Sequence, residues 1–136
     1  KGGPYIYPTS TPTDFDPAEA RLSLTKIRET GCSRLYLTHF GEFTALDDGE
    51  AQMREGLDFL EGLLDESIRG LKAGQSFEVM QGYVASSILE RMKGEVERRE
   101  FYVDEEGEEM MRLDAELNAQ GIVFAASRKA KAEKPV

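Results

Sequence analysis

Hydrophobic and polar positions along the chain alternate mainly with the spacing of helices, and the clearest helix is predicted over residues 17–30. Asp16 fits its N-cap, Pro17 its first helical position, and Gly31 the residue past its end. The apolar residues that share one face of this helix are Ala20, Leu24 and Ile27. The pattern therefore predicts an amphipathic helix that lies against a core.

Three further helices are predicted downstream. The first spans about 48–72, is capped by Asp47 or Asp48, and stops near Gly74. Its apolar stripe consists of Met53, Leu57, Leu60, Leu64, Ile68 and Leu71. Ser76 can cap the next helix, whose stripe consists of Val79, Tyr83, Ile88, Leu89 and Met92. The last helix carries its stripe on Met110, Leu113, Leu117 and Phe124, with Gly107 and Gly121 inside the pattern.

Residues 35–40 alternate with period two and are apolar on nearly both faces. Such a strand is typical of a sheet that is covered on both sides. Only residues 5–7 and 100–103 are weak candidates for a partner strand, and one strand cannot make a sheet. The pattern therefore suggests that part of the fold lies outside these residues.

Composition narrows the classes of function. Of the 136 residues, 40% are hydrophobic and 32% charged, as in a globular protein, and the net charge of -9 argues against nucleic acid as a partner. No uncharged run approaches the roughly 20 residues of a membrane-spanning helix, and no signal peptide is apparent. Because Cys32 is the only cysteine, no internal disulfide can form. We expect a cytoplasmic protein.

His39 is the only histidine and the main candidate for chemistry. A lone histidine at the end of an apolar strand is more often a packing residue. However, strand ends in layered α/β folds gather functional sites, and Gly41 permits a sharp turn two residues later. Metal sites need three or four ligands, which one His and one Cys do not supply. Nucleophile elbows and phosphate-binding glycine loops are also absent from the sequence.

Two segments carry a family resemblance. The segment "YPTSTPTDFDPAEARLSLTKIRETGCSRLYLTHFGEF", within residues 5–43, contains a Pro/Thr-rich loop, an "FDP" helix start and a strand that ends in "THFG". The segment "DAELNAQGI", residues 114–122, contains "LNAQG". In this combination, residues 5–43 and 114–122 resemble the second half of metallo-beta-lactamase-fold hydrolases.

The resemblance implies an α/β fold. Residues 1–46 would be the C-terminal segment of an αββα sandwich, and residues 47–136 a helical C-terminal region. The family's H-x-H-x-D-H signature is absent, and the chain opens on Lys1 followed by Gly2-Gly3-Pro4, so we expect a fragment whose partner is the N-terminal half of the same domain.

The resemblance also implies a metal. His39 would be the last ligand of a dinuclear site that holds zinc, or another divalent metal such as iron or manganese, together with ligands from outside this segment. No catalytic residue is assigned within the chain. Thr38 and Gly41 could order the ligand, and Tyr7, Thr9 and Thr11 could line a substrate loop; packing and turn roles are the alternatives for each.

Two functions follow as hypotheses. The first is the C-terminal part of a metal-dependent hydrolase, whose helices cap the site or form a homodimer and whose small-molecule substrate the sequence does not identify. These residues alone would then be inactive. The second is a non-catalytic, acidic helical module for interaction or dimerisation, in which His39 is merely buried.

Overall fold

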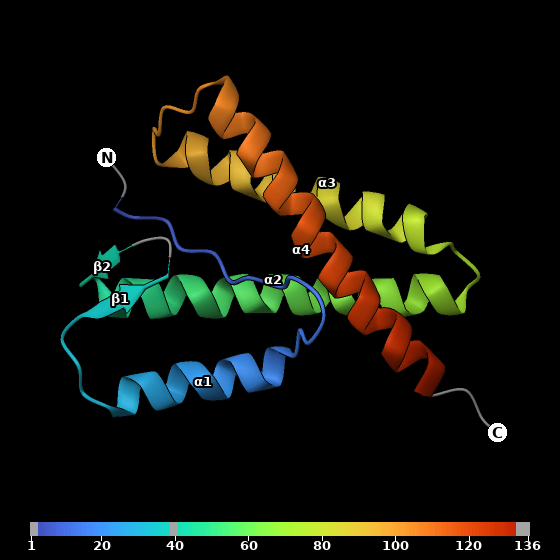
Figure 1. Cartoon of the computed structure of the whole chain (residues 1–136), viewed down its shortest axis with the longest axis horizontal. Helices are drawn as coiled ribbons and strands as arrows, with labels where there is room; N and C mark the ends of the chain where they lie inside the picture. The colour runs from blue at the N-terminus through green and yellow to red at the C-terminus, as the bar shows by residue number, and fades with distance from the viewer. Residues whose placement is uncertain (1–2, 39–40, 133–136) are drawn as a thin grey trace.

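The computed structural model describes residues 3–38 and 41–132. Within them the chain forms helix α1 (Pro17–Glu29), strands β1 (Leu35–Leu37) and β2 (Gly41–Phe43), and helices α2 (Leu46–Lys72), α3 (Phe77–Arg98) and α4 (Glu105–Ala132). Figure 1 shows α4 crossing α2 obliquely while the N-terminal segment runs over α2 toward α4. The hairpin lies beside the start of α2, at the end of the molecule away from the C-terminus.

The predicted helix signals at α1 and α3 are confirmed. The Asp16 carboxylate accepts hydrogen bonds from the backbone N–H groups of Ala18 and Glu19, and Ser76 accepts one from Val79. These bonds satisfy amide donors that have no partner inside the helix. Local chemistry therefore determines where both helices begin.

The predicted start of α2 is wrong by two residues. The helix begins at Leu46, its N-cap is Ala45, and no side chain caps it. Asp47 and Asp48 instead lie in the first turn, where their charges stabilise the positive end of the helix dipole. The end near Gly74 is confirmed, because Gly74 adopts a φ of 93° just after the C-cap Ala73.

The predicted α/β fold class is wrong, because the described residues form four helices of 13, 27, 22 and 28 residues and a single two-stranded antiparallel sheet. Leu35 pairs with Phe43 and Leu37 with Gly41, so residues 35–37 find their partner immediately downstream. Residues 5–7 and 100–103 lie outside helices and strands. Without further strands, the apolar run cannot become the inner strand of an αββα sandwich.

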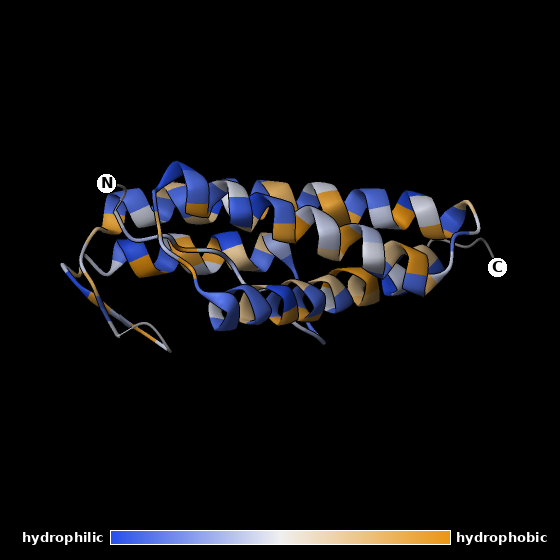
Figure 2. Cartoon of the chain, turned by 90° about the horizontal axis from the view of Figure 1, so that it is seen from above, coloured by the Kyte–Doolittle hydropathy of each residue, from blue (hydrophilic) through white to orange (hydrophobic). Residues whose placement is uncertain are grey.

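The core lies where α2, α3 and α4 meet. Its fully buried large side chains include Leu60 and Leu64 of α2, Ile88 of α3, and Ile122 of α4. Between them α4 contributes mainly small residues, which let the helix backbones approach closely. These small buried residues are Ala115, Ala119, Ala125 and Ala126. Figure 2 shows hydrophobic and hydrophilic residues alternating around every helix, as amphipathic helices require.

The predicted stripes on α3 and α4 are partly wrong. On α3 the buried residues are Met80, Val84, Ile88 and Met92, while Val79 and Tyr83 are exposed. On α4 all four residues of the predicted stripe are exposed, from 38% for Phe124 to 61% for Met110. The reason is that α4 presents its small residues, together with Ile122 and Val123, to the core, whereas the residues of the predicted stripe lie on a second apolar face.

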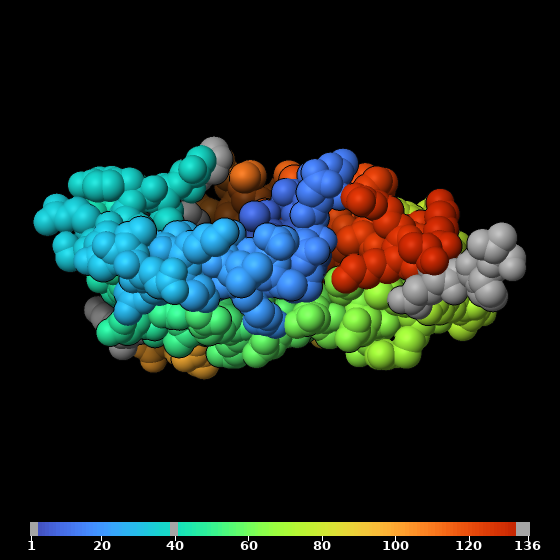
Figure 3. All heavy atoms as spheres, turned by 90° about the horizontal axis from the view of Figure 1, so that it is seen from below, coloured from blue at the N-terminus to red at the C-terminus, as the bar shows by residue number. Residues whose placement is uncertain are grey.

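Helix α1 packs on α2, and both helices form part of the face shown in Figure 3. Ion pairs join the two helices: the Arg21 guanidinium lies 2.7 Å from Asp58 and 2.6 Å from Glu61. The apolar stripe of α1 is only partly covered by α2, and Ile27 of this stripe is 38% exposed. In the described part of the chain, no helix is long and apolar enough to cross a membrane.

Candidate binding cavity

The N-terminal segment, residues 3–13, is fixed across α2 and α4 by polar contacts to its backbone. The Gln52 side chain accepts a hydrogen bond from the Ile6 N–H at 3.0 Å and donates one to the Pro4 carbonyl at 3.1 Å. Arg99, which is 7% exposed, donates to the carbonyls of Gly3 and Pro4 at 2.8 and 3.2 Å. The N-terminal segment belongs to no sheet, so side chains of Gln52 and Arg99 supply hydrogen-bond partners for its backbone.

Ser10 and Asn118 form the most buried of these contacts. The Asn118 Oδ1 accepts hydrogen bonds from the Ser10 backbone N–H at 2.5 Å and from its hydroxyl at 3.1 Å. The Asn118 amide also donates to the Asp114 carbonyl at 2.8 Å. Both residues are nearly inaccessible to solvent, at 0% and 1% exposure. Because water cannot reach their polar atoms, these hydrogen bonds satisfy them instead.

Glycines allow the segment to lie this close to the helices. A Cβ on Gly121 would overlap the carbonyl oxygen of Ser10, and one on Gly56 would lie 2.5 Å from the Pro8 ring. Gly121 costs roughly 1 kcal/mol of helix propensity relative to alanine. Here the glycine makes room for a neighbouring backbone, which explains its place inside α4.

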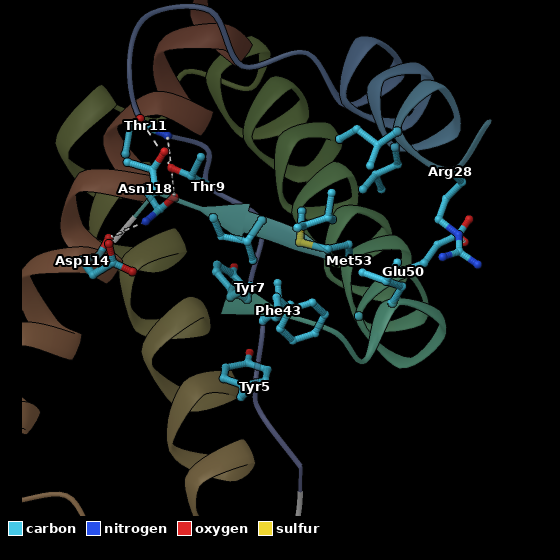
Figure 4. A pocket seen from close by; sticks show the side chains of 18 of the residues that line it. Tyr5, Tyr7, Thr9, Thr11, Arg28, Phe43, Glu50, Met53, Asp114 and Asn118 are labelled. Carbon is cyan, nitrogen blue, oxygen red and sulfur yellow. Dashed lines mark hydrogen bonds and ion pairs between the residues drawn. The ribbon is translucent and has the colours of Figure 1, made fainter. Parts of the chain in front are cut away.

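A half-open cavity of about 1040 Å³ lies between the N-terminal segment, α1, the hairpin, α2, α3 and α4. Figure 4 shows side chains from these elements directed toward a common space. Its apolar lining residues are Ile6, Leu24, Ile27, Leu35, Leu37, Phe43, Leu46, Met53, Met92 and Met110. Its polar lining residues include Tyr5, Tyr7, Thr9, Thr11, Arg28, Thr38, Glu50, Asp114 and Asn118. The volume suits a small organic molecule.

Two tyrosine hydroxyls of the lining, those of Tyr5 and Tyr7, are buried and have no hydrogen-bond partner among the described residues. Burial raises the pKa of Tyr7 well above its ordinary value, and the nearby Tyr5 phenol adds to the effect. The side chain is therefore a neutral hydrogen-bond donor at physiological pH.

The charged groups of the lining are mostly compensated. Arg28 forms an ion pair with Asp47 and another with Glu50, the latter at 2.9 Å. Asp114 lies on the opposite side of the cavity (Figure 4), and desolvation raises the pKa of its carboxyl, against a smaller opposing effect of the hydrogen bond from Asn118. The positive charge of Arg28 is thus neutralised by its two acidic partners. The Asp114 carboxylate makes the electrostatic potential inside the cavity more negative.

The residues singled out from the sequence fall into two groups. Tyr7, Thr9, Thr11 and Thr38 all lie in the cavity lining, although they come from two parts of the chain. Gly41 begins β2 with a φ of 81°, a backbone conformation that favours glycine, and does not line the cavity. His39 lies outside the described residues.

The described residues do not fit a metal by themselves. Residues 3–38 and 41–132 contain no group of three or more His, Cys, Asp or Glu side chains that could hold an ion. Cys32 lines the cavity as a half-buried free thiol and belongs to no such group of described residues.

Sequence reasoning did not identify Ser10 and Asn118. The available signal was a glycine and an asparagine among small residues in "ELNAQG", since this combination in a long helix indicates close approach of another backbone.

Comparison of the chain with protein-family models, with curated proteins and with solved structures finds no match.

Proposed function

We propose that the chain is part of a metal-dependent hydrolase in which the cavity forms one wall of the substrate site and His39 supplies one metal ligand. The remaining ligands would come from residues outside the described part of the chain. In this proposal the helices α2, α3 and α4 support the cavity wall, and the metal is zinc or another divalent ion. We also propose that the protein acts in the cytoplasm, in keeping with its lone cysteine.

The observation that carries the proposal is the meeting of two segments far apart in sequence. The Pro/Thr-rich segment and residues 114–122 resemble the same group of hydrolases, and they contact each other through Ser10 and Asn118. Both then contribute to the cavity, together with Thr38, the residue that precedes His39. A functional wall built from these segments explains why they occur together in one chain.

The test is a metal assay on the natural full-length protein that contains these residues. His39→Ala should lower the bound metal, measured by elemental analysis, and with it the hydrolysis of a chromogenic ester. Cys32→Ala serves as the matched control and should leave metal content unchanged, because the thiol has no companion ligands among the described residues. Full metal content and activity in the His39 variant would contradict the proposal.

A second candidate function is a non-catalytic interaction module that forms a homodimer. The specific observation in its favour is the outer face of α4, where Leu113 and Leu117 are 51% and 47% exposed. An apolar face of this kind is typical of a contact surface. Sedimentation of the protein over a range of concentrations tests it, and Leu113→Lys should shift a dimer to monomer.

A further inference from the structure

We propose that the cavity selects an uncharged molecule with an apolar body and a carbonyl oxygen, which accepts a hydrogen bond from the Tyr7 hydroxyl. This inference rests on the proposed function, because it names the class of substrate for the same site. It is also testable without hydrolysis, since it concerns binding to described residues.

The apolar body is indicated by the walls of the cavity. They are formed by aliphatic and methionine side chains from several parts of the fold, including Leu24, Leu37 and Met53. Methionine is flexible and polarizable, so Met53, Met92 and Met110 can adapt to molecules of different outline. Burial of a ligand of drug-like size against such walls supplies most of its affinity through the hydrophobic effect.

The carbonyl oxygen is indicated by Tyr7. Its buried hydroxyl has no partner in the described part of the chain, and a donor left in this state costs free energy. Because burial raises the pKa of Tyr7, the hydroxyl keeps its proton and can donate it in a hydrogen bond. An ester, amide or ketone oxygen is a matching acceptor and carries no charge into the apolar space.

The absence of charge on the ligand is indicated by the ionic groups of the lining. Arg28 is paired with Asp47 and Glu50, so it offers no free cation to an anionic ligand. Asp114 and the overall charge of -9 repel anions further. A free carboxylate or phosphate should therefore be excluded.

Two naphthalene probes test the selection against charge. N-phenyl-1-naphthylamine is neutral, whereas 1-anilinonaphthalene-8-sulfonate has the same rings and one negative charge. Fluorescence titration of the full-length protein should give an affinity for the neutral probe that is higher by about tenfold or more, a difference of about 1.4 kcal/mol. Equal affinities, or a preference for the sulfonate, would overturn the inference.

Location in the cavity is tested with two variants of α1. Ile27 lines the cavity and Leu22 does not, while both are partly exposed, at 38% and 51%. Ile27→Glu places a charge at the apolar wall and should weaken the neutral probe about tenfold, whereas Leu22→Glu should leave its affinity unchanged. An unchanged helical circular dichroism spectrum excludes loss of the fold as the cause. Equal effects of both variants would contradict binding in this cavity.

The role of Tyr7 is tested with 6-propionyl-2-(dimethylamino)naphthalene, a neutral ketone. Tyr7→Phe removes only the hydroxyl, so it should weaken the ketone about fivefold, the effect of one ordinary hydrogen bond, and leave N-phenyl-1-naphthylamine unaffected. Equal behaviour of the two probes would contradict the assignment. The probe titrations measure binding alone and the elemental analysis measures bound metal, so failure of the metal assay and failure of the probe experiments can be told apart.

Discussion

The two apolar faces of α4 differ in what covers them. The inner face consists largely of small residues, and Ala119, Ile122 and Ala126 are completely buried where α4 packs against α2, α3 and the N-terminal segment. The outer face carries the larger residues Leu113 and Leu117, about half of whose surface is exposed. Hydrophobic size alone therefore does not decide which face is buried.

The difference teaches that close approach of backbones determines the packing of this helix. Small side chains let α4 lie near its neighbours, and Gly121 lets the Ser10 carbonyl pass where a Cβ would stand. The same close approach brings Asn118 within reach of Ser10, so that their buried hydrogen bonds can form. Larger residues on the same face would hold the layers apart.

The largest expected effect comes from truncating the inner face. Ile122→Ala should lower the free energy of unfolding by about 2–5 kcal/mol, because it leaves a cavity among fully buried side chains. Leu117→Ala removes a similar number of atoms from the outer face and should cost less than about 1 kcal/mol, since Leu117 is 47% exposed. Urea unfolding followed by circular dichroism measures both. Equal losses would remove the distinction between the two faces.

The next effect reverses a general trend. Alanine normally stabilises a helix relative to glycine by about 1 kcal/mol, and Gly94→Ala should do so, because nothing lies near the position of its Cβ. Gly121→Ala should instead destabilise the protein by about 1–3 kcal/mol through overlap with the backbone of residues 10–12. Thermal and urea unfolding of the two variants give the signs directly. Stabilisation by Gly121→Ala would show that the segment does not lie there.

Asn118→Ala should also lower the free energy of unfolding. The change leaves the buried Ser10 N–H without its acceptor Oδ1, which should cost about 1–3 kcal/mol, while the Ser10 hydroxyl keeps the backbone carbonyl of residue 118 as an acceptor. Gln52→Ala is the matched control at the other end of the segment, where its hydrogen-bonded partners are more accessible, and should cost less. If the two variants lose the same stability, burial does not distinguish the two contacts.

The smallest effect concerns pH. Because desolvation raises the pKa of Asp114 in the folded protein, this carboxyl contributes stability below the unfolded pKa near 3.8, and the contribution is lost as the pH rises through the raised pKa. Asp114→Asn removes the titration, so its stability relative to the unchanged protein should increase with pH over this window. The difference should be about 0.5 kcal/mol or less, because water reaches the side chain. A difference that decreases with pH would contradict the raised pKa.

The sequence was sufficient to predict the elements with strong local signals. Helices α1 and α3 begin where Asp16 and Ser76 cap them, and α2 ends near Gly74, because these features depend on a few neighbouring residues. The sheet was predicted wrongly because residues 35–37 pair with Gly41–Phe43, a segment too short to show a pattern. The stripe of α4 was wrong because the face that carries its larger apolar residues is the exposed one.

The candidate site was accessible from the sequence only in part. Tyr7, Thr9, Thr11 and Thr38 were proposed from a resemblance, and the structure places them in one cavity lining. The walls from α1 and the pairing of Ser10 with Asn118 depend on contacts between distant parts of the chain, which a single sequence does not reveal. The role of His39 stays a prediction.

A double-mutant cycle between Ser10 and Asn118 tests most directly whether the two segments form one structural unit. Stability is measured for Ser10→Ala, for Asn118→Ala and for the double variant. The hydrogen bond from the Ser10 hydroxyl to the Asn118 Oδ1 predicts a coupling energy of about 1 kcal/mol, because either single change already breaks this side-chain contact. Additive losses would contradict the contact, and with it the observation on which the proposed function rests.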